Sequence, residues 1–235
     1  MIKYRVIIGL FLLLGFSQSY AQTGLNTFSS GTDLSLRNIQ NVQPAMYSNG
    51  TDPIGNASLE DYYSKEWEVV RITFDNNVTQ KYDKVRYNID KKHLELKVGD
   101  KVYFSSTEKI TELVFTESNK VFISKKEDAK LGLLEVVAEY KNIVFVTAYA
   151  ITKLNENQNS YNSNAGEPSL RKSENYYLLK NNESLFKVSK NKKKNAKFFE
   201  EQWGEVAKFA KKEKLSFKKK NDIMKIMEFY ATLKS

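Results

Sequence analysis

The chain has 235 residues, no cysteine and a formal net charge of +9 at pH 7. The lack of cysteine excludes disulfides, thiolate metal ligands and a thiol nucleophile. Only five of the 37 basic residues are arginine, the usual bidentate reader of phosphate and guanine, which argues against specific nucleic-acid recognition.

Residues 1–21 have the features of a secretory signal peptide. Lys3 and Arg5 form a positive start, an apolar run covers 6–16, and the small residue Ala21 suits cleavage after it. The apolar run has roughly half of the ~20 residues that a helix needs to span a bilayer. No cysteine follows for lipid attachment. We therefore predict export to the periplasm or to an outer-membrane-facing or extracellular location, with no membrane span after cleavage.

Residues 22–58 form a polar leader. They are rich in Asn, Ser, Thr and Gly, and they hold Pro44 and Pro53, two of the three prolines of the chain. Because no apolar period is sustained, we predict a flexible leader and a folded part that begins near Leu59.

The region 59–190 has the pattern of short strands. Apolar and polar residues alternate in short runs that are separated by turn-type pairs such as Gly99-Asp100. Connections this short suit hairpins, since parallel strands need long crossovers. We predict an antiparallel β-meander, either a sheet or a partly closed barrel, with a long polar loop at 155–173. The predicted strands are 66–74, 85–89, 93–98, 101–104, 110–115, 120–123, 133–140, 143–154, 175–180 and 184–188.

Residues 191–235 change to a helical period, with apolar residues three or four positions apart. We predict helices at roughly 191–200, 201–213 and 219–233. Short helices are marginal alone in water, so their apolar stripes must be buried against each other or against the sheet. The predicted fold class is α+β, a β domain followed by a small C-terminal helical segment.

The sequence lacks the motifs of familiar catalytic sites, including a Gly-x-Ser-x-Gly elbow and a glycine-rich phosphate loop. His93, the only histidine, lies on an amphipathic strand and is interpreted as a packing or solvent-facing residue. Glu60, Asp61, Glu66 and Glu68 lack the spacing of a calcium loop and are interpreted as a solvated face. We therefore nominate no catalytic, cofactor-binding or metal-binding residue, expect no cofactor, and predict a protein that is not an enzyme.

Two groups of residues have both a binding and a plain structural interpretation. The lysines of 187–197 and 218–220 suit contact with an anionic surface, but they also suit exposed helix starts, which is the preferred interpretation. Aromatic residues such as Tyr62, Tyr63 and Trp67 suit a row that binds sugar or peptide. They are also good strand formers, and packing is preferred for them.

Three features of the folded part carry a family resemblance. They are the strand with Trp67 after a polar leader, the run 85–89 followed by 93–96, and the helical tail over 191–230. In these features the chain, over roughly 66–235, resembles a group of exported proteins of Bacteroidota without an assigned activity. The resemblance implies a periplasmic or outer-membrane-facing location and supplies no activity.

The predicted function is a non-enzymatic binding or scaffold role in the cell envelope, with an envelope protein or an anionic envelope surface as partner. Two alternatives stay open: a carrier of a small apolar ligand in a β-cup, and a carboxylate-dependent hydrolase. A dry apolar cavity would favour the carrier, an exposed apolar patch the scaffold, and two facing carboxylates the hydrolase.

Overall fold

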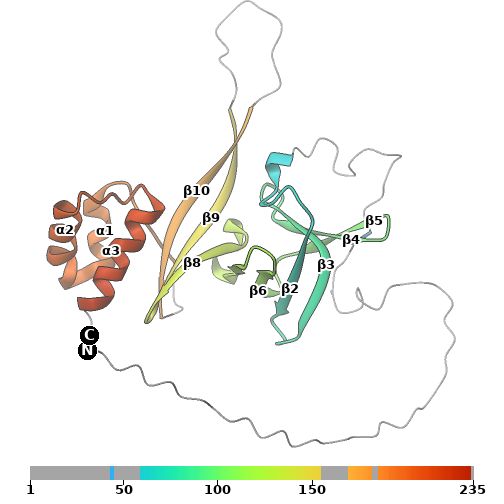
Figure 1. Ribbon diagram of the computed structural model, residues 1–235, viewed down its shortest axis with the longest axis horizontal. Helices are drawn as coiled ribbons and strands as arrows, with labels where there is room; N and C mark the ends of the chain where they lie inside the picture. The colour runs from blue at the N-terminus through green and yellow to red at the C-terminus, as the bar shows by residue number, and fades with distance from the viewer. Residues whose placement is uncertain (1–42, 45–58, 155–168, 182–184, 234–235) are drawn as a thin grey trace, which may run out of the picture. The chain divides into compact units, whose positions relative to one another are not determined.

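The computed structural model describes residues 43–44, 59–154, 169–181 and 185–233 (Figure 1). These residues belong to one unit, Asp33–Ser235. The predicted signal peptide, the predicted leader apart from 43–44, and the 155–168 part of the predicted loop lie outside the described residues. None of the helices in the described ranges has both the length and the apolar character needed to cross a membrane.

The described strands form one antiparallel sheet in the order β1-β5-β4-β3-β2-β6-β7-β8-β9-β10-β11. Its two edges, β1 and β11, do not pair with each other in the described part, so the sheet is open rather than closed into a barrel. Helices follow the strands, which confirms the α+β class. The strands are β1 (Gln43–Pro44), β2 (Glu68–Phe74), β3 (Thr79–Asn88), β4 (His93–Val98), β5 (Lys101–Ser106), β6 (Ile110–Phe115), β7 (Lys120–Ile123), β8 (Leu134–Tyr140), β9 (Ile143–Leu154), β10 (Ser169–Lys180) and β11 (Leu185–Lys187).

Two strands begin earlier than the sequence pattern predicts. β3 begins at Thr79 rather than at residue 85, and β10 begins at Ser169, so 169–173 is strand and not loop. The added residues are mostly polar and exposed, so no apolar alternation marks them. Main-chain pairing with β2 and β9 holds them in the sheet instead.

The strand order departs from a simple meander at β6, which pairs with β2 rather than with β5. The chain from Ser106 to Ile110 spans at most about 15 Å. In a flat sheet β5 and β6 would lie four strand spacings apart, roughly 19 Å. The sheet must therefore curl. β3 provides the bend, because its first part pairs with β2 and its last part, from Val85, pairs with β4.

The curled sheet, β2 to β7, encloses its own apolar core. Leu94, Phe115 and Phe122 are completely buried in it. The ring of Tyr63 packs among these aromatics, with its centroid 5.5 Å from that of Phe115 and 4.7 Å from that of Phe122. Tyr87 is also buried in this core, which agrees with the packing interpretation of the tyrosines.

The helical segment packs on the hairpin of β9 and β10 (Figure 1). Phe145 and Leu178 of the sheet share a core with Phe199, Met227 and Tyr230 of the helices. The observed helices lie within about two residues of the predicted ranges. They are α1 (Lys192–Phe199), α2 (Trp203–Lys212) and α3 (Lys220–Leu233), and the short 3-10 helices are η2 (Leu59–Asp61), η3 (Lys126–Leu131) and η4 (Glu200–Gln202).

Candidate functional site

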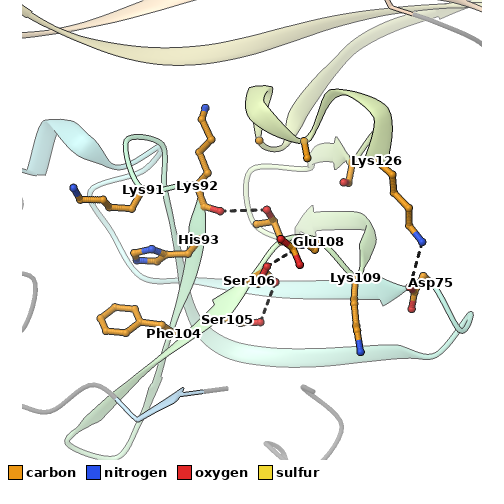
Figure 2. Close-up of a pocket in the computed structure, with 14 residues that line it drawn as sticks. Asp75, Lys91, Lys92, His93, Phe104, Ser105, Ser106, Glu108, Lys109 and Lys126 are labelled. Carbon is orange, nitrogen blue, oxygen red and sulfur yellow. Dashed lines mark hydrogen bonds and ion pairs between the residues drawn. The ribbon is translucent and has the colours of Figure 1, made fainter. Parts of the chain in front are cut away.

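A pocket of about 850 Å³ opens beside β4 and β5 (Figure 2). Its walls come from the β3–β4 turn, the two strands, the β5–β6 connection and η3. The curl described above brings the β5–β6 connection close to the β3–β4 turn, since the Thr107 hydroxyl donates to the Lys92 carbonyl at 3.2 Å. The site is therefore a consequence of the strand order.

Lysines from three separate segments line this pocket. They are Lys91, Lys92, Lys109 and Lys126. Two acidic residues, Asp75 and Glu108, lie among them, and the Asp75 carboxylate is paired with the Lys126 ammonium group at 3.4 Å. The lining therefore carries an excess of positive charge.

Lys92 is held in an unusual backbone conformation. Its φ of 57° lies in the left-handed region, which is costly for a residue with a Cβ. Its ammonium group donates to the Leu131 carbonyl at 3.3 Å. Burial lowers the pKa of the Lys92 ammonium group, and the nearby Asp90 carboxylate partly opposes this effect. Turn residues outside the pocket, such as Lys141 and Asn181, have a similar φ, so this conformation belongs to the tight β3–β4 turn.

The remaining wall combines rings and hydroxyl groups. The rings of His93 and Phe104 meet edge to face, with centroids 4.8 Å apart (Figure 2). The hydroxyl residues are Ser105, Ser106, Thr107 and Ser124. The Ser105 hydroxyl donates to the Ser106 carbonyl at 3.3 Å, and the Ser106 hydroxyl accepts from the Glu108 amide at 3.2 Å.

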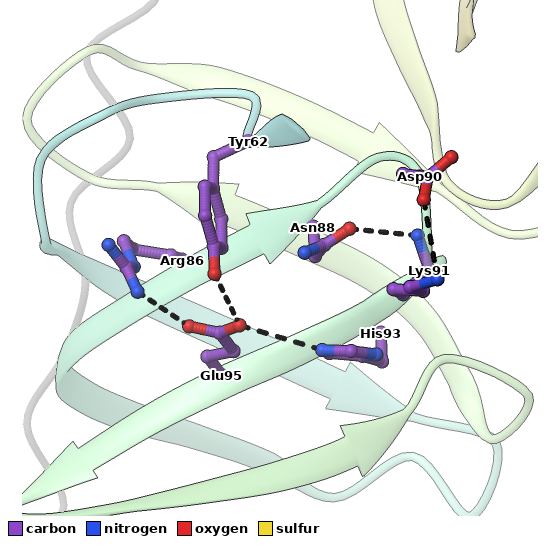
Figure 3. Close-up of polar contacts among 7 residues, drawn as sticks. All are labelled: Tyr62, Arg86, Asn88, Asp90, Lys91, His93 and Glu95. Carbon is purple, nitrogen blue, oxygen red and sulfur yellow. Dashed lines mark hydrogen bonds and ion pairs between the residues drawn. The ribbon is translucent and has the colours of Figure 1, made fainter. Parts of the chain in front are cut away.

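Beside His93 lies the carboxylate of Glu95, a residue that is 1% exposed (Figure 3). It accepts hydrogen bonds from the Tyr62 hydroxyl and from Arg86 Nη2, each at 2.7 Å. The Nε2 atom of His93 lies 3.6 Å from its Oε1 atom. The Arg86 guanidinium lies between the Tyr62 and Trp67 rings, 4.1 Å from each centroid, so the cation that neutralises Glu95 is itself held by two aromatic faces.

A second buried carboxylate, Glu135 of β8, lies outside the pocket lining. It accepts a hydrogen bond from the Tyr149 hydroxyl and pairs with the ammonium groups of Lys120 at 3.0 Å and Lys220 at 3.4 Å. Lys220 is the first residue of α3, so this carboxylate links the helical segment to the sheet.

The two carboxylates respond to their surroundings in the same direction. Burial alone would raise the pKa of each, but the donors around them outweigh this effect. Contacts from His93, Tyr62 and Arg86 hold the pKa of the Glu95 carboxyl below its usual value. Contacts from Tyr149, Lys120 and Lys220 do the same for the pKa of the Glu135 carboxyl. Both groups are therefore ionised at neutral pH.

Some of these residues lie where the sequence pattern predicted them, and others do not. His93 packs on Phe104, as predicted, but it also lines the pocket, which was not predicted. Glu60 is exposed, whereas Asp61 and Glu68 are 8% and 9% exposed, so the solvated-face interpretation is wrong for these two. The alternation of β2 places Glu68 on the same face as buried Val70 and could have indicated its burial.

No group of three or more His, Asp or Glu side chains with the arrangement of metal ligands occurs in the described residues. No protein-family model matches this chain, and comparisons with curated proteins and with solved structures likewise found no match.

Proposed function

We propose that this protein is an exported, non-enzymatic binding protein of the cell envelope, and that its pocket beside β4 and β5 takes a small hydroxylated anion such as a sugar acid. The observation that carries the proposal is that four lysines from three segments line one pocket of about 850 Å³. A volume of this size suits a small ligand.

The chemistry of the lining favours a sugar acid over a simple anion. Ammonium groups attract a carboxylate or phosphate, and Ser and Thr hydroxyls exchange hydrogen bonds with ligand hydroxyls. The Phe104 ring offers an apolar face on which the C–H face of a sugar can pack. All three kinds of group line the same pocket.

Three observations favour binding over hydrolysis. Glu95 and Glu135 have separate sets of partners, so they do not face each other as a catalytic pair. Their lowered pKa values are the opposite of what a general acid needs. In addition, the hydrogen bonds found for the Ser105 and Ser106 hydroxyls go to the backbone and not to His93.

The filled interior of the curled sheet argues against the apolar carrier. A β-cup needs an empty lumen, but Leu94, Phe115 and Phe122 occupy the interior at 0% exposure. The pocket lies outside this core, and most of the residues that line it have polar or charged side chains.

Isothermal titration calorimetry on the mature protein tests the proposed ligand class. Glucuronate is expected to bind, and uncharged glucose at least about 10-fold more weakly, because only the former engages the lysines. Phe104→Leu and Lys109→Gln should each weaken glucuronate binding. The control Lys84→Gln, at an exposed position of β3 outside the pocket, should not. Equal affinities for the two sugars, or equal losses in all three variants, would contradict the proposal.

The proposed export has a separate test. Mass spectrometry of the protein from the envelope fraction of its native cells should find a mature chain that begins at Gln22. An intact N-terminus in the cytoplasmic fraction would contradict export.

A further inference from the structure

The net charge of the chain is concentrated in its helical segment. Residues 191–235 contain 13 lysines, six acidic residues and no arginine, a net charge of +7 out of +9 for the whole chain. The preceding 190 residues are therefore close to neutral. Such asymmetry between two parts of a chain is typical of proteins that contact an anionic surface.

The densest group of lysines begins just before this segment, at Lys187, and continues to the last turn of α1, at Lys197. Its lysines are Lys187, Lys190, Lys192, Lys193, Lys194 and Lys197, all of which are exposed. In the described part of the chain none of the six forms an ion pair within 4.0 Å, and the first turn of α1 has no acidic residue. Positive charge at a helix N-terminus opposes the helix dipole, so helix stability does not explain this arrangement.

Further exposed lysines lie on α2, on α3 and in the connection between these helices. They are Lys208, Lys211, Lys212, Lys214, Lys218, Lys219 and Lys225. A protein that follows a linear polyanion usually collects its cations in one groove and uses arginine for bidentate contacts. Lysines spread over three helices, without arginine, better suit a broad surface whose anionic groups can move laterally.

The helical segment also presents aromatic rings that are only partly buried. Phe209 of α2 and Phe229 of α3 stack with centroids 4.1 Å apart, and both line a groove of about 450 Å³ with Lys225. Partly exposed rings beside lysines are typical of helices that lie at a bilayer interface. A soluble polyanion would offer these rings no apolar environment.

We propose that the lysine-rich helical segment docks peripherally on an anionic lipid bilayer. The lysines supply the attraction to acidic headgroups, and the Phe209–Phe229 pair supplies contact with the interface. The small-anion pocket belongs to the near-neutral sheet, so this surface is independent of the proposed ligand site.

Cosedimentation with lipid vesicles tests the proposal. The mature protein is expected to bind vesicles of 30% phosphatidylglycerol in phosphatidylcholine, and not pure phosphatidylcholine, with affinity that falls as salt rises. The variant Lys192→Gln/Lys193→Gln/Lys194→Gln/Lys197→Gln should bind the anionic vesicles at least about 100-fold more weakly. A control variant, Lys81→Gln/Lys84→Gln/Lys101→Gln/Lys130→Gln, removes the same charge from exposed positions before residue 191 and should change binding less than about 3-fold.

Three results would overturn this inference. They are equal binding to neutral and anionic vesicles, equal losses in the two quadruple variants, and tighter binding to heparin than to the vesicles at equal charge concentration. Glucuronate titration of the helical variant separates this inference from the pocket proposal, because the variant should keep its glucuronate affinity whatever happens to vesicle binding.

Discussion

The curled sheet and the helical segment use charge in opposite ways. The sheet is close to neutral but buries two ionised carboxylates, Glu95 and Glu135, each surrounded by its own donors and cations. The helical segment carries a net +7 and leaves most of its lysines in solvent. In the sheet, buried charges pair with groups on other strands, whereas on the helices most charges are exposed to solvent. The same chain thus separates structural from surface electrostatics, and variants in each region test that separation.

The largest effect is expected for Glu95→Gln. The neutral amide would leave the Arg86 guanidinium, whose side chain is only 12% exposed, without a counter-charge. Breaking a buried pair typically costs about 3–5 kcal/mol. Urea unfolding of the variant should show a loss of this size. The matched control, Glu117→Gln, lies on an exposed turn and should change the free energy of unfolding by less than about 0.5 kcal/mol.

Glu135→Gln tests the second buried carboxylate in the same way, by its effect on the free energy of unfolding. Its cations, Lys120 and Lys220, have side chains 45% and 27% exposed, against 12% for Arg86, so water can solvate them when the carboxylate is removed. The cost should therefore be smaller than for Glu95→Gln. Equal costs would show that solvent access to the partner cations does not decide the outcome.

Acid should destabilise the fold through these two groups. Both carboxyls have pKa values below their ordinary value of 4.5 in the folded state. Their contribution to stability is therefore fully present above about pH 4.5 and is lost as the pH falls through the lower folded values. Urea unfolding between pH 7 and pH 2 should show this loss, with a shallower slope for Glu95→Gln. An unchanged slope in that variant would contradict the assignment.

Gly132→Ala should destabilise the sheet at the pocket. Gly132 has a φ of 73°, and a Cβ there would overlap the Tyr87 hydroxyl, which accepts a hydrogen bond from the Leu133 amide at 3.0 Å. We expect a cost of about 1–3 kcal/mol by thermal or urea unfolding. Gly204→Ala in α2 is the control, since a Cβ there meets nothing within 4 Å. It should be neutral or stabilising by up to about 1 kcal/mol.

The smallest effect is expected for the quadruple glutamine variant at the start of α1. Three of the four lysines, Lys192, Lys193 and Lys194, lie in the first turn of α1, whereas Lys197 lies in its last turn. Removing the first three should relieve their repulsion with the helix dipole, so the variant should stabilise the fold by about 0.3–1 kcal/mol at low salt. The gain should shrink at high salt, because exposed charges are screened. A destabilised variant would mean that these lysines have structural roles, contrary to their interpretation as a docking surface.

Local patterns in the sequence predicted most of the fold. Turn pairs such as Gly99-Asp100 and alternating runs located the hairpins, and the apolar period over 191–235 located the helices. The early starts of β3 and β10 could not be predicted from the sequence. The residues there are mostly polar and exposed, and pairing with neighbouring strands holds them in the sheet rather than burial.

The pocket could not be predicted for a different reason. It depends on the pairing of β6 with β2, which curls the sheet and brings Thr107 to Lys92. No local pattern encodes a pairing between strands that are distant in sequence. The burial of Glu95 was not predicted either. Glu95 lies between Leu94 and Leu96 on a strand whose two faces are both buried there. A simple alternation rule assigns the polar residue of such a strand to solvent.

We have proposed that the sheet binds a small ligand and that the helical segment binds a surface. Amide chemical shifts of the ¹⁵N-labelled mature protein during glucuronate titration test this division most directly. We predict shifts at the amides of 91–93, 104–109 and 124–132, which surround the pocket, and none at 192–233. Shifts concentrated at the lysine-rich helices, or spread evenly over both regions, would contradict it.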